Sequence, residues 1–189
     1  LANGPIIKSV TNLDGPPGIE SQQDADSAAL QVINIIKRNN SADAFVIACF
    51  SDPGIYAARE VTNKPVFGIA ESGILTALSL GSSFGILAIL DTSVPRHVRY
   101  VRSLGLEKRL AGDLAIGLGV AELSDEKKTF HRLLEVGRKL RDNHEASVLI
   151  LGCAGMARYR HNLQESLGIP VVDPSQAAVS MAVSAVLLN

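Results

Sequence analysis

Short apolar segments alternate along this chain with longer segments in which apolar residues recur at helical spacing. The short segments are rich in Val, Ile and Leu and carry little charge, which is typical of strands buried on both faces of a parallel sheet. They predict strands at residues 5–11, 44–49, 66–69, 83–90, 113–118, 147–153 and 171–172. The longer segments predict helices at residues 20–39, 53–61, 71–80, 95–104, 125–143, 159–167 and 175–188. This alternation predicts an α/β fold with parallel sheets.

Two stretches of the chain resemble each other and indicate an internal duplication. Each contains an apolar strand that ends in a cysteine, a helix-like segment, and a Pro-Val pair that begins a further short strand. Cys49 and Pro65 are 16 positions apart, and Cys153 and Pro170 are 17 positions apart. We therefore expect two pseudo-symmetric lobes, each with a parallel sheet flanked by helices. The first lobe would comprise residues 1–91 and the C-terminal helix 175–189, and the second lobe residues 92–174.

Both cysteines fall where a predicted strand ends and a helix begins. Ligands bind at that edge of open α/β sheets, so we expect the active site in the cleft between the lobes, with one cysteine on each wall. Buried structural thiols, a disulfide and zinc ligands are alternatives. The chain lacks secretory features and has neither a Cys-x-x-Cys nor a His-Glu-x-x-His motif. The matched placement favours a pair of catalytic thiols.

Two thiols on opposite faces of one substrate can invert a stereocentre without a cofactor. One thiolate removes a proton from carbon while the opposing thiol delivers a proton to the other face. A helix N-terminus behind each sulfur is expected to lower the thiol pKa. The carbanion also needs stabilisation as an enolate, for which backbone N–H groups are suitable. The candidate donors belong to Phe50, Ser51, Ala154 and Gly155, and Gly152 and Gly155 let the backbone approach a ligand closely.

The composition narrows the classes of partner. The chain has 189 residues, 47% of them hydrophobic, so it can bury a substantial core. Its formal net charge is −1, with no block of one sign, which argues against nucleic acid. No apolar run approaches the length of a transmembrane helix, and the first residues show no signal-peptide pattern. We expect a cytoplasmic protein that binds a small molecule and neither nucleic acid nor membrane.

Other polar residues are compatible with a site role or a structural role. Glu71, Thr92 and Ser93 lie at predicted strand ends that would line the cleft, yet each is equally suited to the start of a helix. Asp52 is better placed as a helix cap than as a base. Exposed helix faces are expected to carry His97, His131, His144 and His161. The same is expected of Arg96, Arg99 and Arg102, as a solvated face or an oligomer contact.

At these residues the chain resembles the Asp/Glu/hydantoin racemase superfamily, in particular its hydantoin racemase and allantoin racemase branch. The motifs that carry the resemblance are Ile-Ala-Cys-Phe-Ser-Asp-Pro-Gly (47–54), Ala-Ala-Arg-Glu (57–60), Pro-Val-Phe-Gly-Ile-Ala-Glu-Ser (65–72) and Leu-Gly-Cys-Ala-Gly-Met (151–156). The resemblance implies a homo-oligomeric, cofactor-independent racemase. It would invert C5 of 5-monosubstituted hydantoins or allantoin, with Cys49 and Cys153 as the two acid/base thiols.

Two alternatives stay open, and the chain departs from the family pattern at two points. The alternatives are an aspartate/glutamate-type racemase or maleate isomerase of the same superfamily, and a non-catalytic two-lobed binding protein.

Family members begin with an additional strand ending in Asn-Pro-Asn-Thr/Ser, and this chain begins just downstream of it; trimming is the expected reason. Gly18 stands where a serine is usual, so a hydroxyl contact is lost or substrate preference is altered. The 5-substituent, the preferred enantiomer and the subunit number are not defined by the sequence.

Overall fold

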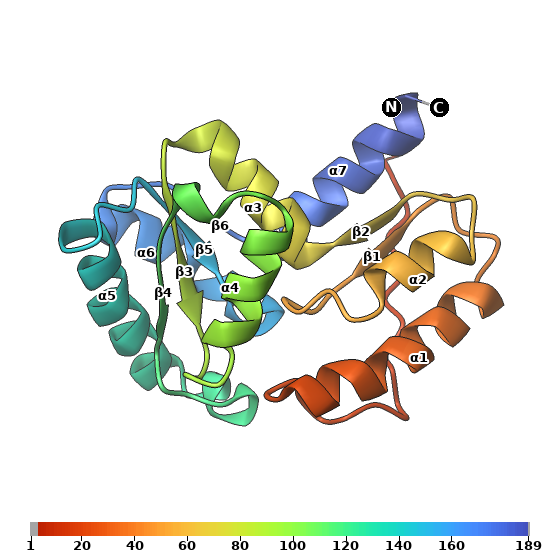
Figure 1. Ribbon diagram of the computed structural model, residues 1–189, viewed down its shortest axis with the longest axis horizontal. Helices are drawn as coiled ribbons and strands as arrows, with labels where there is room; N and C mark the ends of the chain where they lie inside the picture. The colour runs from red at the N-terminus through yellow and green to blue at the C-terminus, as the bar shows by residue number, and fades with distance from the viewer. Residues whose placement is uncertain (1–3, 189) are drawn as a thin grey trace.

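The computed structural model describes residues 4–188 and shows an α/β fold (Figure 1). Residues 1–3 and 189, at the ends of the predicted first lobe and last helix, lie outside the described residues. The helices are α1 (Gln22–Arg38), α2 (Ile55–Glu60), α3 (Ile69–Leu80), α4 (Val94–Ser103), α5 (Glu126–Asp142), α6 (Arg160–Leu167) and α7 (Pro174–Leu188). The strands are β1 (Phe45–Ile47), β2 (Val66–Gly68), β3 (Phe84–Ala88), β4 (Leu110–Ala115), β5 (Val148–Leu151) and β6 (Val171–Val172). Short 3₁₀ helices are η1 (Glu107–Arg109), η2 (Val120–Ser124) and η3 (Ala154–Tyr159).

The strands form two parallel sheets, which confirms the predicted class of fold. β1 pairs with β2, and the larger sheet has the strand order β4-β3-β5-β6. The predicted division at residue 91 would assign β3 to the first lobe, whereas β3 lies inside the larger sheet between β4 and β5. All five residues of β3 are buried, as expected for a strand with a partner on each side and helices over both faces.

The larger sheet separates two hydrophobic cores. Because successive side chains of a strand point to opposite faces, Leu149 and Leu151 enter the core formed with α5 and α6. Val148 and Ile150 enter the core formed with α3 and α7. A smaller core joins α1 and α2 to the two-stranded sheet, and Figure 1 shows these two helices side by side next to β1 and β2. In the described part of the chain, no helix has both the length and the apolar character needed to cross a membrane.

Two predicted strands differ from the structure. Residues 5–11 are irregular, and Ile6 is 99% exposed, because no strand of the described chain pairs with this segment. β4 begins and ends earlier than the predicted strand at 113–118. Gly117, with a φ of 73°, turns the chain after β4, so Ile116 and Leu118 are buried outside the strand. Apolar character alone did not separate the strand from the buried turn that follows it.

Helix starts also differ from the prediction. α2 begins at Ile55 with Gly54 as its N-cap, two positions beyond Pro53, the expected first helical residue. α7 begins at Pro174, and the Ser175 N–H donates to Asp173 Oδ1 at 2.9 Å, so the capping side chain is Asp173 and not Ser175. The 3₁₀ helix η3, which the spacing did not predict, leads from the second cysteine into α6.

Candidate active site

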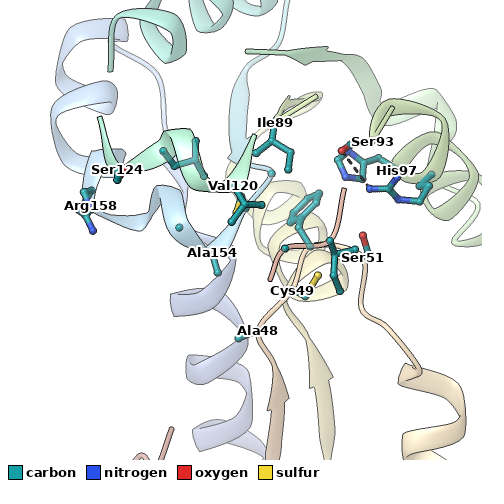
Figure 2. Close-up of a pocket in the computed structure, with 18 residues that line it drawn as sticks. Ala48, Cys49, Ser51, Ile89, Ser93, His97, Val120, Ser124, Ala154 and Arg158 are labelled. Carbon is teal, nitrogen blue, oxygen red and sulfur yellow. Dashed lines mark hydrogen bonds between the residues drawn. The ribbon is translucent and has the colours of Figure 1, made fainter. Parts of the chain in front are cut away.

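A pocket of about 440 Å³ lies where the carboxyl ends of strands from both sheets meet (Figure 2). Its walls come from the segments that follow β1, β3 and β5. Of the ten residues proposed for the site, eight line it: Cys49, Phe50, Ser51, Ser93, Gly152, Cys153, Ala154 and Gly155. Figure 2 shows Ser93 and His97 on one side of the pocket and Ser124 and Arg158 on the other. The pocket is therefore bounded by both copies of the duplicated segment.

The two cysteines have equivalent local geometry. The Cys49 carbonyl accepts a hydrogen bond from the Asp52 N–H at 2.9 Å, and the Cys153 carbonyl accepts one from the Met156 N–H at 3.1 Å. In each turn, the backbone N–H two residues after the cysteine donates to the sulfur. Both cysteines are free thiols. No cluster of three or more His, Cys, Asp or Glu side chains suited to a metal ion occurs among residues 4–188.

Both thiols have a raised pKa, contrary to the expectation from helix dipoles. Burial, with smaller contributions from the charges of Cys153 and Asp52, raises the pKa of Cys49 to about 11, against the hydrogen bonds from Ser51. Burial also raises the pKa of Cys153, against the hydrogen bond from the Gly155 N–H. The expected lowering of the thiol pKa is wrong because neither sulfur lies at the N-terminus of an α-helix. α2 begins well after Cys49, and the element after Cys153 is a short 3₁₀ helix. Each sulfur is therefore a protonated thiol at neutral pH.

Two backbone N–H groups next to the sulfurs are available to a ligand. Phe50 and Ala154 directly follow the two cysteines, and neither N–H has an acceptor among the described residues. The N–H groups of Ser51 and Gly155 already donate to the sulfurs. The first pair, rather than all four groups, is therefore free to stabilise negative charge on a bound oxygen.

Glu71 and Thr92 do not line the pocket, although both were proposed for it. Glu71 lies in the first turn of α3 and forms an ion pair with Arg59. Thr92 is exposed, and its Oγ1 donates to the Glu20 carbonyl at 3.1 Å. Both side chains are thus engaged in contacts that join elements of the fold.

Asp52 caps a helix, as expected, but the helix is α3 and not α2. Its Oδ1 accepts the Ala70 N–H and its Oδ2 the Glu71 N–H, each at 2.9 Å. The Tyr100 hydroxyl of α4 donates to the same carboxylate at 3.2 Å. Burial raises the pKa of Asp52 to about 6, although these three hydrogen bonds and α3's N-terminus favour the ionised form. The loop that carries Cys49 is therefore tied to both α3 and α4.

Two residues of α4 that were expected at the surface line the pocket instead. His97 is only 5% exposed, and its Nδ1 lies 2.9 Å from Asp113 Oδ2 on β4. The Phe50 ring meets the imidazole nearly at right angles, with the centroids 5.1 Å apart. Arg96 lies beside His97 on the pocket wall. The signal that sequence reasoning overlooked is the spacing of four between His97 and Val101, which places both on the buried face of α4.

Comparison with known proteins places this architecture in a family. A family model described as Asp/Glu/Hydantoin racemase matches residues 2–182. The chain belongs to the Asp/Glu/hydantoin racemase family. A hydantoin racemase of Paenarthrobacter aurescens is 36% identical over 194 residues, which cover 100% of this chain and 82% of the relative. The predicted family and the predicted enzyme class, a racemase, are confirmed.

Solved structures of this racemase family share its fold. The allantoin racemase from Pseudomonas fluorescens superposes with a TM-score of 0.93 at 29% identity, covering 97% of this chain and 79% of that chain. The allantoin racemase from Klebsiella pneumoniae superposes with a TM-score of 0.84 at 34% identity, covering 92% and 72% respectively.

Gly18 of this racemase lies against Val120 at the pocket wall. A Cβ at Gly18 would lie 2.9 Å from Val120 Cγ2, closer than carbon atoms pack. A serine at this position therefore requires the Val120 side chain to shift. The glycine and the valine together form part of an apolar wall that also includes Ile19, Ile89 and Leu123.

Proposed function

We propose that the protein racemises 5-monosubstituted hydantoins, a class that includes allantoin, at C5 and without a cofactor, using Cys49 and Cys153 as acid and base. The observation that carries the proposal is the equivalent placement of two free cysteines in matching turns on the wall of one pocket. Relatives named hydantoin racemase and allantoin racemase support the substrate class.

The reaction moves one proton out of the substrate and one proton in. The thiolate of one cysteine removes the C5 proton and becomes a thiol, while the electron pair of the C–H bond passes into the neighbouring C4 carbonyl. The opposing thiol then donates its proton to the other face of C5 and becomes a thiolate. The product is the opposite enantiomer, and the net protonation of the enzyme is unchanged. The reverse direction exchanges the roles of Cys49 and Cys153.

The electrostatics of the pair suit this sequence of steps. The charge of Cys153 raises the pKa of Cys49, so two thiolates in one pocket repel each other. Once one thiolate forms, the other cysteine is held as a thiol. One thiolate facing one thiol is the protonation state that a two-base racemase requires. Burial of both sulfurs also makes each thiolate a stronger base toward carbon than a solvated thiolate.

The enolate intermediate carries negative charge on the C4 oxygen. The free N–H groups of Phe50 and Ala154 are placed to donate hydrogen bonds to such an oxygen from either cysteine loop. A single donor of this kind contributes about 10²–10³ in rate in other enzymes. Backbone donors are retained when side chains are replaced, so this contribution persists in cysteine variants.

The test follows proton exchange and optical rotation together. One enantiomer of 5-benzylhydantoin, and separately of allantoin, is incubated with the protein in deuterated water, and the spontaneous rate is subtracted. We expect racemisation with deuterium at C5, lost in both Cys49→Ala and Cys153→Ala. Cys49→Ser and Cys153→Ser should retain exchange from one face, each favouring the opposite enantiomer. Ser79→Ala, at an exposed position of α3, is the control.

The outcomes separate the candidate mechanisms. Full activity in both alanine variants would refute the two-thiol mechanism. Turnover of an amino acid or of maleate, with none of either hydantoin, would instead assign the protein to another activity of the superfamily. Thermal stabilisation by hydantoins without turnover would indicate a binding protein.

The family resemblance also implies a homo-oligomer, which we retain as part of the proposal. Leu75 and Leu80 of α3 and Leu187 of α7 are 45%, 53% and 61% exposed, and burial of such side chains would favour association. Light scattering coupled to size-exclusion chromatography tests it, since a single-subunit mass at micromolar concentration would contradict the expectation.

A further inference from the structure

The pocket contains a buried titratable pair that the two-thiol mechanism does not use. His97 Nδ1 lies 2.9 Å from Asp113 Oδ2, and the two side chains are 5% and 1% exposed. The imidazole lines the pocket, whereas Asp113 lies behind it on β4. Within the described residues, the imidazole's other nitrogen, Nε2, has no hydrogen-bond partner. Nε2 is not one of the buried side-chain atoms that lack a partner, so it is open to a ligand in the pocket.

The aspartate determines which nitrogen of His97 carries the proton. Burial raises the pKa of Asp113, and the contact with His97 acts against that rise and favours the carboxylate. The carboxylate only accepts hydrogen bonds, so the Nδ1 that faces it donates. A neutral imidazole with its proton on Nδ1 has an unprotonated Nε2, which accepts a hydrogen bond. The Phe50 ring, 5.1 Å away and nearly perpendicular, restricts rotation of the imidazole. With Asp113 ionised and this neutral tautomer of His97, the pocket presents an acceptor at Nε2.

Arg96, the residue before His97 in α4, lines the same pocket and carries hydrogen-bond donors. Arg96 Nη1 is engaged with the carbonyls of Glu20 and Thr92, and Nη2 with Ser93 Oγ at 3.3 Å. Arg96 Nε is buried with no partner among the described residues, and Nη2 has a second proton. The pocket wall thus combines the acceptor of His97 with the guanidinium of Arg96.

We propose that His97, oriented by Asp113, accepts a hydrogen bond from a ring N–H of the substrate, so that the pocket selects cyclic ureides by an N–H group next to a carbonyl. The inference rests on the proposed function and extends it to the recognition of the ring. Each ring N–H of a hydantoin adjoins a carbonyl. The N–H can donate to His97 while the carbonyl accepts from a donor of Arg96. Dicarboxylates have no N–H to donate to this acceptor, and the ammonium group of a free amino acid is not bonded to a carbonyl carbon as the ring N–H of a hydantoin is. His97 is a binding residue and Asp113 a positioning residue.

Methylated substrates test the contact on the unaltered protein. The probes are 5-benzylhydantoin and its N1-methyl and N3-methyl derivatives, with spontaneous racemisation subtracted. We expect one of the two methylations to raise KM by about tenfold or more, the effect of one lost hydrogen bond and of an acceptor left unpaired against the bound ligand. The kcat of that derivative should change less than its KM, because the contact is made in both the ground state and the transition state.

Protein variants identify the partner of the methylated nitrogen. In His97→Ala, the sensitive derivative and the parent should have KM values within about twofold of each other, because the acceptor is gone. His97→Gln, which retains an acceptor oxygen, should recover part of the discrimination. In Asp113→Asn, the amide can donate to Nδ1, so Nε2 becomes the protonated nitrogen and a donor. This change should also abolish the discrimination between the sensitive derivative and the parent. His161→Ala, whose imidazole is exposed on α6, is the matched control.

The outcomes distinguish this inference from the proposed function. Racemisation of all three probes with KM values within twofold overturns the role of His97 and leaves the racemase proposal standing. A methyl effect that persists undiminished in His97→Ala also overturns it, because another group then meets that nitrogen. If Asp113→Asn lowers the melting temperature but keeps the methyl effect, Asp113 is merely structural. Absence of racemisation with every probe overturns both proposals together.

Discussion

The ionisation of Cys49 gives the most direct test of the site's electrostatics. Its pKa is raised by burial to about 11, against 9.0 for an unperturbed thiol. At pH 7 this difference lowers the thiolate fraction from about 1 in 10² to about 1 in 10⁴. Because only the thiolate is alkylated, ionisation alone should slow the reaction of Cys49 with iodoacetamide about 100-fold relative to an exposed cysteine.

The assay is the alkylation rate of each cysteine, measured between pH 7 and 11 by mass spectrometry of the peptides that contain Cys49 and Cys153. We expect the rate at Cys49 to rise about tenfold per pH unit without levelling below pH 10. Restricted access to the pocket lowers the rate at every pH equally, so the midpoint and not the absolute rate reports the pKa.

A variant separates the two causes of the raised pKa. Replacing Cys153 by alanine removes a thiol whose ionisation raises the pKa of Cys49, so the Cys49 midpoint should fall while burial still holds it above 9.0. Ser79→Ala should leave the midpoint unchanged. A midpoint at or below 9 in the unaltered protein would contradict the reasoning, and would restore the original expectation of thiols activated by helix N-termini.

Three further predictions concern the surrounding structure. Asp52 has a folded pKa of about 6 against 3.8 unfolded. Its contribution to the free energy of unfolding should therefore fall by about 3 kcal/mol as the pH rises from about 4 to 6. Denaturant titrations should show this pH dependence in the unaltered protein and a weaker one in Asp52→Asn. Gly18→Ser should lower racemase activity through the clash with Val120, and Val120→Ala in the same chain should restore it; failure of this rescue would show that the two residues are not coupled. Leu149→Ala, at a fully buried position of β5, should cost about 2–5 kcal/mol of stability in the same titrations, and a loss below 1 kcal/mol would contradict its place in the core.

The local sequence pattern was sufficient to predict most helices and strands and the positions of the two cysteines. Helices α1 and α5 end within two residues of the predicted bounds, because their apolar residues recur at helical spacing and Ser21 and Asp125 cap them. The duplicated motif predicted matched positions for Cys49 and Cys153, with 16 and 17 positions from each cysteine to the next Pro-Val pair, and the structure shows a similar turn after each cysteine. The predictions from sequence were wrong where a residue suits both an exposed helix face and a pocket wall, because only the packing of distant elements decides between the two.

The sequence by itself determined the α/β class, the alternation of strands and helices, and the two cysteines at strand ends, because these follow from side-chain periodicity and turn chemistry within short segments. The tertiary structure alone decided that Asp52 caps α3, that His97 is buried against Asp113, and that Glu71 and Thr92 do not line the pocket. It also decided the sign of the thiol pKa shifts, because desolvation depends on every element packed around a sulfur and not on the residues adjacent to it in the chain.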